Sequence, residues 1–72
     1  MKARIRLETM SDVQKFVGIA TQEKAGIFIT DGQGLKVSGK SLLGALYALE
    51  FDALWVESKA NLWQELKDFI VI

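Results

Sequence analysis

The 72-residue chain contains no cysteine, no histidine and no proline. Without cysteine it can form neither a disulfide nor a thiolate metal site, and small secreted domains usually depend on such cross-links. The lack of histidine removes the most frequent general base and the most frequent metal ligand. We therefore expect a cytoplasmic protein that has no metal, no cofactor and no enzymatic activity.

Neither sign of charge is in excess, because nine basic residues balance nine acidic ones. A neutral chain offers no bulk electrostatic attraction to nucleic acid. The longest apolar-rich stretch, residues 42–56, is too short to span a membrane and carries Glu50 and Asp52. No basic segment followed by an apolar one opens the chain, as it would in a secretory signal. These features predict a protein that binds neither nucleic acid nor a membrane.

Apolar residues make up 50% of the chain, which is enough for the core of one small domain, residues 1–72. Apolar and charged residues alternate over residues 2–8, which predicts a strand with one face in water. Ser11 and Gln14 match the S-x-x-Q capping box, so we expect a helix from Asp12 to Ala25. Gly26 stands where a glycine would end that helix.

Residues 27–30 and 35–38 are expected to form a β-hairpin around the turn sequence Asp31–Gly34. Ser41 is a favourable N-cap for a second helix over residues 42–49. That helix is apolar almost all round, and its leucines cannot all face one core. It is therefore either buried on two sides or exposes an edge, Leu42–Leu43–Leu46, that docks another protein.

A fourth strand at residues 54–56 and a last helix over residues 62–70 complete the order β-α-β-β-α-β-α. This order predicts an α+β fold, an open-faced β-sandwich with helices stacked on one face of the sheet. The predicted core consists of Ala3, Ile5, Leu7, Val13, Phe16, Val17, Ile29, Val37, Leu54, Val56, Leu66 and Phe69.

Residues 34–41 match the phosphate-loop pattern G-x-x-x-x-G-K-S. In that motif, backbone amides and a lysine hold phosphates at the start of a helix. Here the four middle residues are predicted to be a strand instead of a loop. The other interpretation is a strand, a bend at Gly39 and a capping serine. A small nucleotide- or phosphate-binding protein that uses Gly39, Lys40 and Ser41 remains an alternative.

The segment Lys40-Ser41-Leu42-Leu43-Gly44, together with the order of elements, resembles the HPr family. This family comprises the small phosphocarriers of the bacterial sugar phosphotransferase system. Its members have the same β-α-β-β-α-β-α order and a similar K-S-aliphatic-aliphatic-G stretch at the start of the second helix. The resemblance covers nearly the whole chain in layout, and its residue-level support is concentrated in residues 40–44.

The resemblance implies roles for individual residues. Ser41 falls on the serine that a dedicated kinase phosphorylates in many members, with Lys40 beside the phosphate. Leu42, Leu43 and Leu46 fall on the patch that meets the family's partner proteins. The phosphorylated histidine of the family has no counterpart, because residues 8–12 read Glu-Thr-Met-Ser-Asp. A serine or threonine there could not replace it, since phosphate esters are too stable for easy onward transfer.

These observations predict a non-catalytic, HPr-like regulatory module that binds a protein through its second helix and is modulated at Ser41. It is not expected to act as a phosphocarrier. Two alternatives stay open besides this one. The first is the phosphate-binding protein described above, and the second is a structural homo-oligomer whose leucine patch is its own interface.

Overall fold

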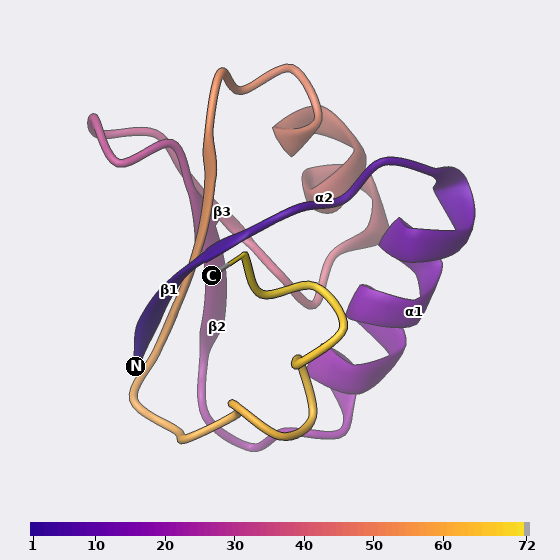
Figure 1. Cartoon of the computed structure of the whole chain (residues 1–72), viewed down its shortest axis with the longest axis vertical. Helices are drawn as coiled ribbons and strands as arrows, with labels where there is room; N and C mark the ends of the chain where they lie inside the picture. The colour runs from indigo at the N-terminus through magenta and orange to yellow at the C-terminus, as the bar shows by residue number, and fades with distance from the viewer. Residues whose placement is uncertain (72) are drawn as a thin grey trace.

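Four short strands form one antiparallel sheet in the computed structural model of the chain, which describes residues 1–71. Two helices pack on one face of this sheet, so the chain has two layers (Figure 1). The α+β class predicted from the sequence is confirmed. The bounds are β1 Lys2–Ile5, α1 Met10–Thr21, β2 Ile27–Thr30, β3 Lys36–Ser38, α2 Leu42–Ala48 and β4 Leu54–Ser58.

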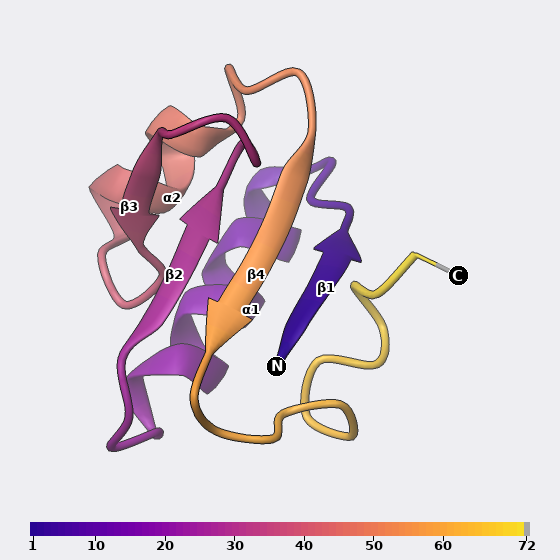
Figure 2. The ribbon, with the colours of Figure 1, turned by 90° about the vertical axis from the view of Figure 1, so that its left-hand side faces the viewer.

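The strands lie side by side in the order β1-β4-β2-β3, and each neighbouring pair is antiparallel. Val56 on β4 is paired with Ala3 on one side and with Ile29 on the other, and Ile29 is also paired with Val37. Directly paired residues point to the same face of a sheet, so this row faces the helices together. The opposite face is bare, with both helices behind it (Figure 2).

The core lies between the sheet and the two helices, and most of the predicted core positions are confirmed. Phe16 on α1 and Ile29 on β2 are fully buried, as predicted. Val17 and Val37 are only partly buried, at the margin of the core. Additional buried hydrophobic residues, not predicted, are Ala20, Ile27, Ala45, Ala48 and Leu62.

The predicted hairpin joins β2 to β3. The Asp31 carboxylate accepts hydrogen bonds from the backbone amides of Gln33 (2.7 Å) and Leu35 (3.0 Å), which closes the turn. Gly32 and Gly34 have φ angles of 78° and 119°, a region that favours glycine. The turn sequence therefore supplies both the side-chain acceptor and the backbone freedom that the hairpin needs.

The predicted start of α1 is wrong, because the N-cap is Thr9 and not Ser11, and the helix begins at Met10 instead of Asp12. Thr9 has an extended backbone (φ −124°, ψ 163°), and its hydroxyl accepts a hydrogen bond from the Asp12 amide at 3.1 Å. The Asp12 carboxylate in turn accepts from the Glu8 and Thr9 amides, which completes a capping box. Ser11 already lies inside the helix.

The Glu8 amide, and then the Thr9 amide, hold the pKa of the Asp12 carboxyl below its ordinary value of 3.8. These hydrogen bonds favour the ionised form. Because the pKa of Asp12 is lower in the folded state, its ionised carboxylate stabilises the fold at pH values above the ordinary pKa. This contribution to the free energy of unfolding is lost as the pH falls through the folded-state pKa.

The two candidate caps can be separated by a pair of substitutions. We expect Thr9→Ala to lower the free energy of unfolding by about 1 kcal/mol, because it removes the hydroxyl that accepts from Asp12. Ser11→Ala is the matched control and should change it by less than about 0.5 kcal/mol. Urea unfolding monitored by circular dichroism measures both. A larger loss for Ser11→Ala than for Thr9→Ala would contradict the observed cap.

The end of α1 also differs from the prediction, since the helix ends at Thr21 rather than Ala25. The Glu23 carboxylate accepts from the amides of Lys24 (3.1 Å) and Ala25 (3.4 Å). These amides would otherwise bond to helix carbonyls four residues back. Among residues 1–71 only Gly32 and Gly34 have positive φ, so Gly26 does not form the left-handed cap that was predicted.

The predicted last helix over residues 62–70 is wrong, because this segment does not form a regular helix, and the element order therefore ends with β4. Residues 63–69 form successive turns, with a helix-like bond from the Leu66 amide to the Leu62 carbonyl at 2.9 Å. Beyond Phe69 the chain extends along β1, where Ile70 forms a bridge with Ile5. The Arg6 amide donates to the Phe69 carbonyl at 2.8 Å. Extension along β1 is incompatible with a helix that continues to residue 70.

Candidate functional site

The second helix, α2, carries the residues that the sequence singles out for partner binding. Its start is confirmed, because the Ser41 hydroxyl accepts a hydrogen bond from the Gly44 amide at 3.0 Å. The helix spans Leu42–Ala48, one residue less than predicted. None of its seven residues is charged.

Small residues form the buried face of α2. Ala45 and Ala48 are fully buried. A Cβ atom on Gly44 would approach the Ser38 carbonyl oxygen to 3.2 Å, so the helix lies close against the end of β3. This close approach leaves the larger side chains of α2 on the opposite face.

Leu42 and Leu43 are exposed, as expected for a docking edge, with 43% and 79% of their surface accessible. Leu46 is different, because it is partly buried against the core. Tyr47 is 57% exposed and lies one turn beyond Leu43. The helical period places these four side chains on one arc, which we call the α2 patch: Leu42, Leu43, Leu46 and Tyr47.

Tyr47 was not among the predicted docking residues. Its ring lies edge-on to that of Phe51, with a centroid distance of 5.8 Å and an interplanar angle of 85°. This contact joins Tyr47 to Phe51, which is partly buried against the core just beyond the end of α2. The i,i+4 spacing from Leu43 was the signal in the sequence that could have identified Tyr47.

Lys40, expected beside a phosphate, makes an internal contact. Its ammonium group donates a hydrogen bond to the backbone carbonyl of Glu23, in the loop after α1. The side chain is partly buried and links that loop to the start of α2. Lys40 therefore has a structural contact in addition to any role at Ser41.

The segment that matches the phosphate-loop pattern uses its backbone amides internally. The Gly39 amide donates to the Ile27 carbonyl at 2.7 Å, and the Lys40 amide donates to the Ser38 hydroxyl at 3.2 Å. The Ser41 amide is bonded to the Ser38 carbonyl. A phosphate cradle needs such amides to point at the ligand. The strand β3 also occupies the place where the motif requires a loop.

Gly39 is required by packing. It is buried, and a Cβ atom there would lie 3.0 Å from an Ile27 methyl and 3.1 Å from the Phe16 ring. Both neighbours belong to the core, so they have little room to move. The bend at Gly39 that the sequence analysis considered therefore has a steric cause.

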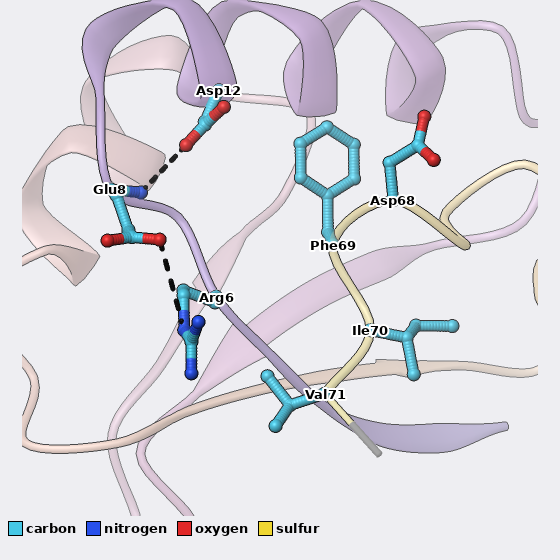
Figure 3. Close-up of a pocket in the computed structure, with 7 residues that line it drawn as sticks. All are labelled: Arg6, Glu8, Asp12, Asp68, Phe69, Ile70 and Val71. Atoms are coloured by element: carbon cyan, nitrogen blue, oxygen red, sulfur yellow. Dashed lines mark hydrogen bonds and ion pairs between the residues drawn. The ribbon is translucent and has the colours of Figure 1, made fainter.

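A hollow of about 510 Å³ lies where the first loop meets the C-terminal segment (Figure 3). Its charged lining comes from Arg6, Glu8, Asp12 and Asp68. Arg6 and Glu8 form a long ion pair at 3.9 Å, and both side chains are exposed. The Asp12 carboxylate and the Thr9 hydroxyl are already used by the capping box. Within residues 1–71, no group of three or more acidic side chains, those of this hollow included, is placed so that it could hold a metal ion.

Comparison of the chain with models of protein families, with curated proteins and with solved structures finds no match. In the part of the chain that the structure describes, no helix has the length and apolar character needed to cross a bilayer.

Proposed function

We propose that the chain is a non-catalytic, HPr-like module that acts in the bacterial cytoplasm and binds a protein partner through the α2 patch. The main support for the proposal is that α2 buries its small side chains and exposes its large apolar ones. Its alanines are buried, whereas Leu42, Leu43 and Tyr47 lie in water. A contiguous exposed apolar patch on an uncharged helix is typical of a protein-docking surface.

The HPr-like part of the proposal depends on two features. The segment Lys40-Ser41-Leu42-Leu43-Gly44 opens α2, as the corresponding stretch does in that family. The two-layer α+β architecture, with both helices on one face of a four-stranded sheet, is compatible with it. Because the chain contains no histidine, the proposed module binds partners of a phosphotransferase system without passing on a phosphoryl group.

Leu43 gives the most direct test, since it is the most exposed side chain of the patch. We expect Leu43→Ser to weaken binding to the general phosphotransferase enzyme of a sugar phosphotransferase system by about tenfold or more. Truncation of an interface anchor typically has an effect of this size. Stability should change little, because Leu43 is 79% exposed. Isothermal titration calorimetry with both purified proteins measures the affinity.

Leu35→Ser is the matched control, because Leu35 is also an exposed leucine but lies in the β2–β3 turn. It should leave binding unchanged. Equal weakening by both substitutions, or no binding by the wild type, would contradict the proposal. A dimer that dissociates only in Leu43→Ser, seen by sedimentation, would assign the α2 patch to self-association.

Modulation at Ser41 belongs to the same proposal. A phosphate on Ser41 would add negative charge beside Leu42, at the margin of the α2 patch. In the same titration, Ser41→Asp should change the affinity, whereas Ser41→Ala should mainly cost about 1 kcal/mol of stability through loss of the cap. Equal affinities for the wild type and Ser41→Asp would remove the regulatory part of the proposal.

A further inference from the structure

One face of the sheet is not covered by a helix (Figure 2). Paired residues point to the same side, so the register defines two outward rows. The rows are Arg4–Trp55–Thr30–Lys36 and Lys2–Glu57–Phe28–Ser38, and we call them together the open face. The alternating residues of β1 and β4 are buried against the helices, and Val37 of β3 is partly buried. Within the outward rows Thr30 is itself buried.

Two aromatic rings lie on the two central strands of the open face. Trp55 is on β4 and partly exposed, and Phe28 is on β2 and 37% exposed. Trp55 is paired with Thr30, and Phe28 with Glu57, which makes the two rings diagonal neighbours on adjacent strands. Diagonal neighbours on a sheet are about 7–8 Å apart. The rings thus form two adjacent platforms on an open surface.

Positive groups lie near both rings, two beside Trp55 and one beside Phe28. The Lys2 ammonium and the Arg4 guanidinium lie 5.8 Å and 5.7 Å from the Trp55 ring centroid. The Lys36 ammonium lies 5.2 Å from the Phe28 centroid and 3.1 Å from the Glu57 carboxylate. Glu57 is the only acidic side chain of the open face, against three cations. The open face therefore has a positive net charge, although the chain as a whole is neutral.

We propose that the open face binds single-stranded RNA, with bases stacked on Trp55 and Phe28 and phosphates paired with Lys2, Arg4 and Lys36. Aromatic side chains on a four-stranded antiparallel sheet are an established way of stacking unpaired bases. A duplex would not present its base faces to such platforms. This surface lies on the other side of the sheet from the helices, so the inference is independent of the α2 patch.

The Glu57 carboxylate favours RNA over DNA as the ligand. Its hydrogen bond to Lys36 uses one carboxylate oxygen, Oε1. The second oxygen is an acceptor that a ribose 2′-hydroxyl can donate to, and DNA lacks this donor. The net charge of zero predicts no nucleic-acid binding, but it averages over the whole chain, whereas the cations and rings gather on one face.

Fluorescence anisotropy with a labelled 12-nucleotide oligouridine, at about 50 mM salt, tests the proposal. Trp55→Ala and Phe28→Ala should each weaken binding by about fivefold or more, the usual range for loss of one stacked base. Trp63→Ala is the matched control, because Trp63 is also exposed but lies in the C-terminal turns. It should leave the affinity unchanged. Circular dichroism confirms that each variant is folded.

A second variant keeps the test valid if Trp55→Ala does not fold. Arg4→Gln preserves the strand and should reduce the salt dependence of binding, which we expect to have a log–log slope of about −2 for three phosphate contacts. Absence of binding, equal loss with Trp63→Ala, or an unchanged slope in Arg4→Gln would overturn the proposal. Equal affinity for oligothymidine would overturn the assignment to RNA, and binding only to anionic lipid vesicles would overturn nucleic acid as the ligand.

Discussion

Phe16→Ala is expected to lower the free energy of unfolding by about 3–5 kcal/mol. Phe16 is completely buried, and its ring lies edge-on to that of Phe69, with centroids 5.9 Å apart. It also lies in the tight contact beneath Gly39. Small domains have a total stability of only about 5–15 kcal/mol, so this variant should be close to unfolded at 37 °C. Urea unfolding at 25 °C measures the change.

Phe28→Ala is the matched control for this substitution, because Phe28 is a phenylalanine of the same fold with its ring on the open face. It should cost clearly less than Phe16→Ala, since less apolar surface is removed from the interior. A loss below about 1 kcal/mol for Phe16→Ala, or equal losses for the two variants, would show that the core is not centred on α1.

Leu66→Ala is expected to cost about 2–5 kcal/mol, although Leu66 lies in a segment without a regular helix. Its side chain is completely buried, and its amide is bonded to the Leu62 carbonyl. Loss of this anchor should also expose the amides that join the C-terminal segment to β1, those of Arg6 and Val71. Urea unfolding measures the stability, and hydrogen exchange measures the protection of these two amides.

Lys67→Ala is the control, because Lys67 is the exposed neighbour of Leu66. It should alter stability by less than about 0.5 kcal/mol. If Leu66→Ala reduced protection only at Arg6 and Val71 and left global stability unchanged, the C-terminal segment would unfold separately from the sheet. That result would contradict the expected contribution of Leu66 to the core.

The strands could be predicted well because their signals are local. The alternation of residues 2–8 fixes which face of β1 is buried, although the strand ends at Ile5 and is shorter than predicted. The strand β2 has the bounds that were predicted, Ile27–Thr30. The hairpin followed from Asp31 and its glycines, which act within the turn itself. The β4 strand was predicted at 54–56 and extends to Ser58, because pairing with β2 continues to Ile27.

The ends of the helices were harder to predict, because competing caps lie close together. Thr9 with Asp12 and Ser11 with Gln14 are both acceptable capping pairs by residue type. Which pair forms the cap depends on where the strand β1 ends.

The prediction of a last helix was wrong for a related reason, since the apolar residues Leu62, Leu66 and Phe69 can also be buried by a series of turns. Pairing of Ile70 with β1 is a long-range contact that periodicity does not reveal.

At the candidate site, the sequence predicted an exposed apolar edge on α2, and two of its three residues are exposed in the structure. Leu42 and Leu43 are exposed, but Leu46 is partly buried and Tyr47 was missed. Hydrophobicity alone could not separate the two faces of α2, because alanine and leucine are both apolar. The close approach of α2 to β3 selects the small side chains for the interior, and this depends on the tertiary structure.

The pairing of Ile70 and Val71 with β1 also bears on how the protein behaves at high concentration. Sheets with long, unpaired outer strands can join edge to edge into fibres, because the free backbone N–H and C=O groups of an edge strand pair with a further chain. Here one border of the sheet is occupied by the C-terminal segment. The other border, β3, has only three residues and begins with Lys36. Within residues 1–71, the sheet thus presents little unpaired backbone, and fibril growth through its borders is disfavoured.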